Sequence, residues 1–181
     1  MKAWTKLMAV AGLVTGLGLA AVPASADTAA YCGITWGSLD KSAGALSQAP
    51  VTNVRAGRHD CYDRLVIDIA GADNGFTVSY ESTVYDQGGA AIALRGGAFL
   101  AINLLNPAYD EDGASTYDPS NPRELVNVAG WRTFRQAAWG GSYEGYTTIG
   151  LGVRARLPFR AFSLDGPGGA SRVVIDVAHK W

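Results

Sequence analysis

The chain has 181 residues, 17% of them charged and 48% hydrophobic, and its formal net charge is −1 at pH 7. This length suggests one domain. The weakly acidic balance argues against a nucleic-acid partner, because a protein that binds nucleic acid presents a basic face. Only two histidines and two cysteines are present, which leaves little scope for a zinc site.

The first 26 residues have the pattern of a secretory signal peptide. Lys2 and Lys6 provide a positive start, residues 7–22 are apolar, and Ala24-Ser25-Ala26 is a small-residue cleavage site. A membrane anchor is the alternative, but the apolar run is short for a span and the cleavage site follows it directly. We therefore expect a secreted chain that begins at Asp27 and has no membrane span after cleavage.

Cys32 and Cys61 are the two cysteines of the chain. In an oxidising compartment two cysteines most simply form one disulfide. Such a bridge would fasten the N-terminal segment to the strand that follows Cys61. A catalytic thiol is the alternative, but thiols outside the cell rarely stay reduced, and a metal site would need more ligands.

Residues 27–50 form an arm rich in Ala, Ser and Gly, in which 36–41 fits one helical turn with Ser38 as its N-cap. From residue 51 onward, short β-type runs alternate with glycine-rich turns, and no further helix is predicted. This pattern predicts an all-β domain over 51–181, a mostly antiparallel β-sandwich or small barrel of about eight to nine strands. The expected strands are residues 51–55, 64–70, 76–85, 91–95, 98–105, 132–139, 146–154, 159–164 and 172–178. Residues 91–95 and 98–105 are either two strands or one strand bent at Gly96-Gly97, and residues 125–128 are expected to be short and extended.

Two local features shape the predicted topology. The Asn74-Gly75 pair tolerates the positive φ angles of a tight turn, so we expect a hairpin there, with 76–85 as the return strand. Residues 106–123 contain three prolines and an acidic run, and they predict a long irregular loop.

One strand motif occurs twice in the chain. Arg, three apolar residues and Asp run from Arg64 to Asp68 and again from Arg172 to Asp176. If the two strands pair antiparallel, one register places Arg64 opposite Asp176 and Asp68 opposite Arg172, and each such pair stabilises by roughly 0.2–1 kcal/mol. A parallel pairing would place like charges together. The alternative is that the strands are symmetry-related on two different sheets.

No catalytic constellation emerges from the sequence. Ser142 lies in the glycine-rich segment 140–145, but Glu144 breaks the Gly-x-Ser-x-Gly spacing of a nucleophile elbow, and no strand-to-helix turn is predicted. A turn is the simpler interpretation. Carboxylates are plentiful, yet no acid/base pair of a glycosidase can be named without geometry.

Metal-binding patterns are weak. His59 and His179 do not form a pair with ligand spacing. Asp110, Glu111 and Asp112 could gather around calcium, which prefers carboxylate oxygens, but their spacing is not that of an EF-hand. A solvated acidic loop is the simpler interpretation, and no cofactor is expected.

Aromatic side chains suggest a binding surface over the last third of the chain. Trp131, Arg135, Trp139, Tyr143 and Tyr146 lie on neighbouring predicted elements. Aromatic rings with a few polar groups can stack on sugar rings or anchor a protein partner, although core packing is the alternative for each. Strict alternation places Arg135 and Trp139 on one face of their strand, which favours partial exposure of both.

Five runs of the sequence carry a resemblance to a known family, and they are 58–68, 107–110, 133–136, 148–154 and 172–181. On these runs the chain resembles the secreted AMIN-like domain proteins of actinobacteria over most of residues 50 to 181. AMIN domains are β-sandwich modules that place cell-wall amidases or secretins in the envelope by binding peptidoglycan. The resemblance therefore implies a secreted or wall-associated, non-catalytic module that binds peptidoglycan or another wall glycan.

Two other functions stay open at this point. One is a protein-interaction domain of the envelope, which would use the same aromatic surface. The other is a secreted hydrolase of an unrecognised type, which would require a concave polar cleft with two neighbouring carboxylates.

Overall fold

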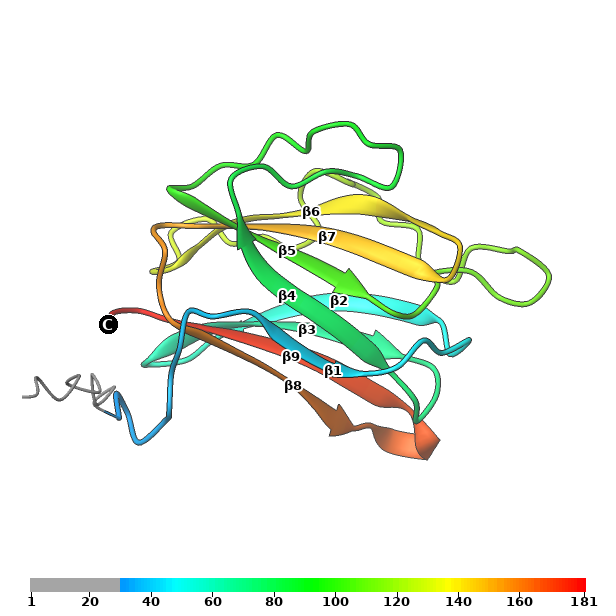
Figure 1. Ribbon diagram of the computed structural model, residues 1–181, viewed down its shortest axis with the longest axis horizontal. Coiled ribbons are helices and arrows are strands. Elements are labelled where there is room, and N and C mark those ends of the chain that lie inside the picture. Colours follow the sequence, from blue (N-terminus) through cyan, green and yellow to red (C-terminus); the bar gives the residue numbers. More distant parts are fainter. Residues whose placement is uncertain (1–29) are drawn as a thin grey trace, which may run out of the picture.

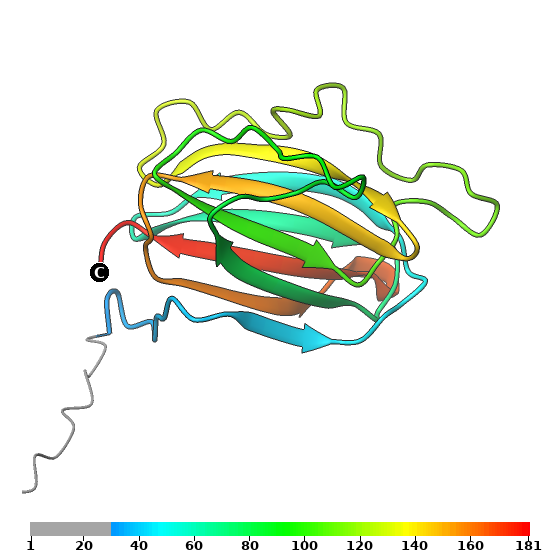
Figure 2. The same cartoon turned by 45° about the horizontal axis from the view of Figure 1, so that its top comes forward.

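The computed structural model describes residues 30–181, which fold into a two-layer antiparallel β-sandwich (Figures 1 and 2). The expected signal peptide and the first residues of the arm lie outside this described range. The sheets do not close into a barrel. Within residues 30–181, no helix is long and apolar enough to cross a membrane. The strands are β1 Lys41–Gly44, β2 Val51–Arg58, β3 Tyr62–Ile69, β4 Gly75–Glu81, β5 Ala98–Leu104, β6 Phe134–Tyr143, β7 Tyr146–Val153, β8 Phe159–Asp165 and β9 Ser171–Ala178.

The two sheets have different sizes. The larger sheet has the order β1-β4-β5-β7-β6, and the smaller has the order β2-β3-β9-β8. A 3-10 turn at Pro167–Gly169 connects β8 to β9. In the smaller sheet the two central strands, β3 and β9, carry the repeated motif, so the last strand is hydrogen-bonded to the third.

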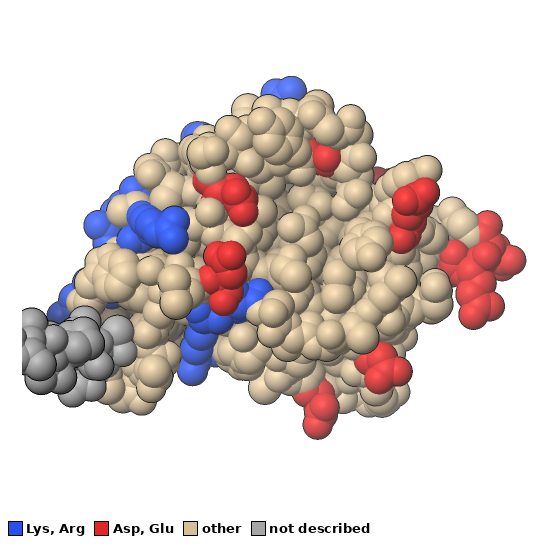
Figure 3. All heavy atoms as spheres, in the orientation of Figure 1, with Lys and Arg blue, Asp and Glu red and all other residues tan. Residues whose placement is uncertain are grey.

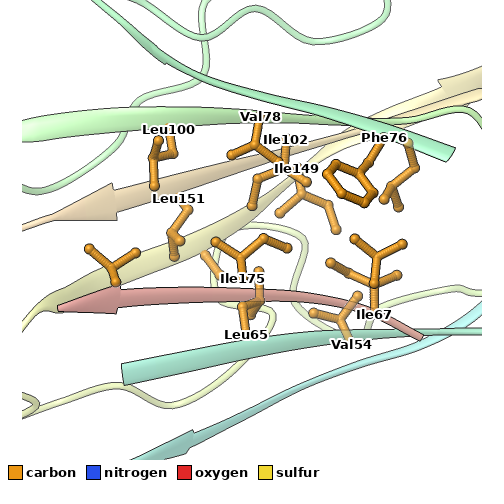
Figure 4. Close-up of a cluster of buried hydrophobic side chains, with 14 of the residues drawn as sticks. Val54, Leu65, Ile67, Phe76, Val78, Leu100, Ile102, Ile149, Leu151 and Ile175 are labelled. Carbon is orange, nitrogen blue, oxygen red and sulfur yellow. The ribbon is translucent and has the colours of Figure 1, made fainter. Parts of the chain in front are cut away.

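The core lies between the sheets and follows the period-two pattern of the strands. Leu65 and Ile67 point inward from β3, toward the layer that contains Phe76 and Val78 of β4 (Figure 4). Ile69 belongs to the same buried cluster. All five are almost completely buried. Each such side chain contributes roughly 1.5–3 kcal/mol by leaving water, so this apolar layer is what holds the two sheets face to face.

The predicted hairpin at Asn74-Gly75 is wrong, because β3 and β4 belong to different sheets. The chain crosses from one layer to the other at this point. Gly75 serves close packing instead: a Cβ there would lie 2.5 Å from the carbonyl oxygen of Ala45. Asn106 secures the crossing, since its Oδ1 accepts from the Gly75 amide at 3.1 Å and its Nδ2 donates to the Ala49 carbonyl at 2.8 Å.

The N-terminal arm is more regular than its composition suggests. The predicted helical turn over 36–41 is absent, and Lys41–Gly44 is a strand that pairs with β4. Trp36 is buried and donates from Nε1 to the Tyr31 carbonyl at 2.8 Å. Tertiary contacts of Trp36 and strand pairing therefore override the weak local helix signal.

Residues 82–97 form no strand, contrary to the prediction for 91–95, and lie instead across the outer face of the larger sheet (Figure 1). Glycines on β6 and β7 make room for this covering segment. A Cβ on Gly150 would meet Leu94 at 2.9 Å, and one on Gly152 would meet the Arg95 carbonyl oxygen at 2.0 Å. Residues 125–128, expected to be short and extended, form no strand, and the Leu125 amide donates to the Ala137 carbonyl at 2.8 Å.

A bulge in β6 changes which residues face the core. The register against β7 shifts between Phe134 and Gln136, so Phe134, Ala137 and Trp139 pack inward. The strict alternation predicted for 132–139 is therefore wrong beyond Arg135. The strand also continues to Tyr143, which leaves only a two-residue turn at 144–145, with positive φ at both positions as in a type I′ hairpin.

Candidate functional site

The long loop between β5 and β6 closes one open side of the sandwich. It is hydrogen-bonded to the edge of the smaller sheet, where the Val51 amide donates to the Pro107 carbonyl and the Thr116 hydroxyl donates to the Val51 carbonyl, both at 2.7 Å. It also covers the edge of the larger sheet, where the Trp139 amide donates to the Pro122 carbonyl at 2.7 Å. A loop held at both sheets is a fixed wall for a binding site.

This loop and β6 enclose a hollow of about 460 Å³. Its aromatic part is Trp139, whose ring meets that of Tyr117 edge-on at a centroid distance of 5.2 Å. Both side chains are half-buried, and burial raises the pKa of the Tyr117 hydroxyl. The lining residues are Ala108, Tyr109, Gly113, Ser115, Tyr117, Asp118, Pro119, Pro122, Trp139 and Ser142.

Polar groups of the hollow are held in place by the neighbouring hairpin. The Tyr109 hydroxyl accepts from the Gly145 amide at 2.7 Å. The Ser142 hydroxyl accepts from the Ala108 amide at 2.8 Å and donates to the Tyr146 carbonyl at 3.0 Å. Ser142 is thus a structural hydroxyl at the strand end. The arrangement offers two aromatic rings with fixed hydroxyls beside them, which is the chemistry that recognises a sugar ring.

The five aromatic and arginine residues predicted as one surface do not come together. Trp131 stacks on Phe134 at 6.1 Å, and the Arg135 guanidinium donates to the Trp131 carbonyl at 2.9 Å, both at the start of β6. Tyr143 and Tyr146 are exposed at the opposite end of that strand. Only Trp139 enters the hollow.

The structure contains the Cys32–Cys61 disulfide, whose two cysteines have a sequence separation of 29. Closing a loop of this size stabilises the fold by roughly 3–4 kcal/mol on the loop-entropy model. The bridge holds the arm beside the start of β3, and the aromatic ring of Trp36 lies 5.8 Å from that of Tyr62. The arm thereby contributes an aromatic residue to the smaller sheet.

The outer face of the smaller sheet carries the first charged pair of the repeated motif. β3 and β9 run antiparallel with Arg64 opposite Asp176. Arg64 donates from Nε to Oδ1 at 2.6 Å and from Nη2 to Oδ2 at 2.9 Å, and this hydrogen bonding raises the pKa of the guanidinium. Asp176 is fully buried and also accepts from Arg160 Nε on β8 at 2.7 Å. Two guanidinium groups therefore share one carboxylate.

The second pair of the motif behaves differently. Asp68 lies opposite Arg172 in the register, but its carboxylate accepts instead from Arg55 Nε at 2.8 Å and Arg55 Nη2 at 2.9 Å. Among residues 30–181, Arg172 forms no ion pair. Sequence reasoning missed Arg55 and Arg160, since both sit on outer strands that the motif does not include.

The acidic loop and the two histidines hold separate structural positions. Within the described chain, no group of three or more His, Cys, Asp or Glu side chains could hold a metal ion. Asp110 accepts from the Asp112 and Ala114 amides and so stabilises its own turn, while Glu111 and Asp112 are exposed. The ring of His59 stacks on that of Tyr62, and His179 Nε2 lies 3.1 Å from Asp63 Oδ1.

Asp63 was not singled out by its sequence context. It is buried, and its Oδ2 accepts from the amides of Thr133 and Phe134 at 2.7 and 2.9 Å, while its Oδ1 lies 3.1 Å from His179 Nε2. These contacts connect the start of β3, the start of β6 and the C-terminal segment. A buried carboxylate with two amide donors is a fold-stabilising group.

Charge is unevenly distributed over the molecule. In Figure 3 the Lys and Arg side chains gather toward the end where the C terminus lies, and Asp and Glu dominate the opposite end. The turns at that acidic end include Asp73, 110–112 and Glu144. The aromatic hollow borders this acidic end, so it is poorly suited to an anionic ligand.

Comparison with known proteins gives one match. A family model described as the AMIN-like domain matches residues 49–179. Neither a curated protein nor a solved structure matches the chain.

Proposed function

Because the chain belongs to the AMIN-like domain family, we propose that it is a non-catalytic module of the cell envelope that binds peptidoglycan or another wall glycan. Family membership indicates the envelope, and the disulfide is consistent with an extracellular or envelope location. The hollow beside Trp139 is where we place the glycan.

The observation that carries this proposal is the edge-on pair of Trp139 and Tyr117 inside a hollow of about 460 Å³. A volume of this size suits a small ligand such as one or two sugar rings. The aromatic rings offer apolar faces for the C–H side of a sugar, and the neighbouring hydroxyl and carboxylate oxygens can accept from its hydroxyl groups. The loop walls are already hydrogen-bonded to both sheets, so little ordering is needed on binding.

The lining of the hollow also bears on the hydrolase alternative. Asp118 is the only carboxylate among its lining residues. Glycoside hydrolysis by the usual mechanism requires two carboxylates on either side of the scissile bond. The hollow therefore favours binding over cleavage.

Co-sedimentation with purified peptidoglycan, stripped of phosphate-containing polymers, tests this proposal. We expect the intact protein to be retained, and Trp139→Leu to weaken retention about tenfold, because it removes one aromatic contact of about 1–1.5 kcal/mol. Asp118→Asn should weaken retention less, and it leaves packing untouched because Asp118 is exposed.

Tyr85→Ala is the matched control, since Tyr85 is exposed on the segment that covers the larger sheet, away from the hollow. It should leave retention unchanged. Absence of retention of the unaltered protein above an unrelated control, or an equal loss in Tyr85→Ala, contradicts the proposal. Thermal unfolding of each variant shows whether a loss of binding reflects a loss of fold.

A further inference from the structure

We propose that the outer face of the smaller sheet is a second binding site, which takes the phosphate groups of a linear phosphodiester polymer. This inference is independent of the aromatic hollow. It rests on a cationic groove on the outer face of strands β2, β3, β9 and β8. The N-terminal arm packs Trp36 on the Tyr62 end of this face, and no residue of the arm lines the groove.

The register aligns side chains of this face in rows across the sheet. One row contains Arg64 and Asp176 with Arg160 beside them. The row two residues further along the strands contains Arg55, Val66, Val174 and Phe162. The next row contains Asp68 opposite Arg172. Successive rows on one face are about 7 Å apart, so guanidinium groups recur along the strands at a regular spacing.

The face has an excess of positive charge although the chain as a whole has a net charge of −1. The face has four guanidinium groups but only two carboxylates, Asp68 and Asp176. Two positive charges are therefore left over. The guanidinium groups that create this excess are Arg55, Arg64, Arg160 and Arg172.

Three of these four arginines line the first of two adjoining hollows, and Arg160 lines neither. The first, of about 220 Å³, has Gly57, Val66 and Val174 in its lining, together with Arg55, Arg64, Arg172, His59, Ala56 and Leu164. The second, of about 450 Å³, extends toward the 3-10 turn and is lined by Gly166 and Pro167. Arg55 and Arg172 line both hollows. Together the two hollows form a groove that suits an extended chain.

Geometry favours a phosphate over a carboxylate in the first hollow. A carboxylate is planar and is satisfied by one arginine fork, as Asp68 is by Arg55. Here guanidinium groups from β2, β3 and β9 surround one space. A tetrahedral phosphate offers oxygens in several directions and can accept from all three.

Aromatic rings keep the cationic groups in position. The Arg160 guanidinium lies 4.9 Å from the ring centroid of Phe162 and 5.6 Å from that of Trp36, and the Arg64 guanidinium lies 5.2 Å from that of Tyr62. Such cation–π contacts contribute about 0.5–1 kcal/mol each at exposed sites. They hold the guanidinium groups in place before a ligand arrives, which lowers the entropy cost of binding.

The test measures binding of the full chain to poly(glycerol phosphate), polygalacturonate, neutral dextran and phosphatidylglycerol vesicles. We expect binding to poly(glycerol phosphate) that weakens as salt is raised, because the charges at the rim are exposed to solvent. Arg172→Gln should weaken it about tenfold through the loss of one charge-assisted hydrogen bond. Because Arg172 has no ion pair within residues 30–181, this variant should fold normally.

Gly57→Val provides a second variant that fills the hollow. A Cβ at Gly57 has its nearest contact at 3.8 Å, from His59 Nε2, so the strand accepts a side chain while the floor is occluded. We expect it to weaken polymer binding at least as much as Arg172→Gln. Arg123→Gln is the charge-matched control, because Arg123 is exposed on the β5–β6 loop, and it should leave binding unchanged.

Several outcomes would overturn the inference. They are an equal loss in Arg123→Gln, binding of polygalacturonate or of the vesicles as tight as that of poly(glycerol phosphate), and no binding of poly(glycerol phosphate) at all. The Trp139→Leu variant should bind poly(glycerol phosphate) as tightly as the unaltered protein, while its retention by peptidoglycan weakens about tenfold. The two proposals can therefore fail separately.

Discussion

The two outer faces of the sandwich are built in opposite ways. The outer face of the larger sheet carries small residues such as Gly150 and Gly152, and residues 82–97 lie directly on it. The outer face of the smaller sheet carries arginines, aspartates and aromatic rings. The N-terminal arm packs Trp36 on its Tyr62 end, and no residue of the arm lines the groove that contains Arg55 and Arg172. Small side chains thus let a segment lie flat on one face, whereas long side chains border an open groove on the other.

The largest expected effect on stability comes from the Cys32–Cys61 disulfide, which fixes the N-terminal arm beside the smaller sheet. Replacing Cys32 and Cys61 together by Ser should lower the free energy of unfolding by roughly 3–4 kcal/mol. Urea unfolding of the variant, and of the unaltered protein with and without reductant, measures this. A loss well under 1 kcal/mol would mean that Trp36 and β1 hold the arm without the bridge.

The next effect separates the two halves of the repeated motif. Asp176→Ala should cost about 3 kcal/mol, at the lower end of the range for a broken buried pair, since Arg64 and Arg160 can still reach water. Asp68→Ala should cost no more than about 1 kcal/mol, because its partner Arg55 is half-exposed. Chemical denaturation of both variants makes the comparison. An equal loss in the free energy of unfolding for both variants would show that burial of Asp176 does not make its ion pairs more stabilising than that of Asp68.

The repeated motif also shows which structural features the sequence alone can predict. The alternation of apolar residues predicts the core face of β3, and the matched spacing of Arg and Asp predicts the register with β9. Neither pattern identifies Arg55 as the partner of Asp68, because that choice depends on side-chain reach across a third strand. Likewise the Asn74-Gly75 signal marks a change of direction, but core packing decides that the chain crosses to the other sheet.

The candidate sites were harder to predict than the core. The hollow depends on the β5–β6 loop, whose segment 106–123 has no periodicity, so nothing in the sequence brings Tyr117 beside Trp139. The β6 bulge then moves Trp139 to the face opposite the one that strict alternation implies. Irregular backbone, which local patterns describe poorly, is what assembles the hollow.

A pair of glycines gives a smaller and more direct test of the two faces. Gly152→Ala should cost about 1–3 kcal/mol, because the new Cβ would lie 2.0 Å from a backbone oxygen of the covering segment. Gly57→Ala should change stability by no more than about 0.5 kcal/mol, as its Cβ has ordinary contacts. Urea midpoints measure both. Similar values would mean that segment 82–97 can lift away freely.

The smallest expected effect on stability concerns Tyr80, which lies between the two sheets. Its replacement should not affect binding at either outer face. Its hydroxyl donates to the Leu157 carbonyl at 2.7 Å and accepts from the Leu157 amide at 3.1 Å, so Tyr80→Phe should cost about 1 kcal/mol at neutral pH. Burial raises the pKa of Tyr80 to about 12, above the value near 10 expected in the unfolded chain.

The unfolded chain therefore ionises Tyr80 first as pH rises. The stabilisation by this group is fully present below pH 10 and is lost as pH approaches about 12. Unfolding curves across this range should show the unaltered protein losing its advantage over Tyr80→Phe. A constant difference between the two proteins through pH 12 would show that the hydroxyl reaches solvent, and that the interior between the two faces is less closed than its contacts indicate.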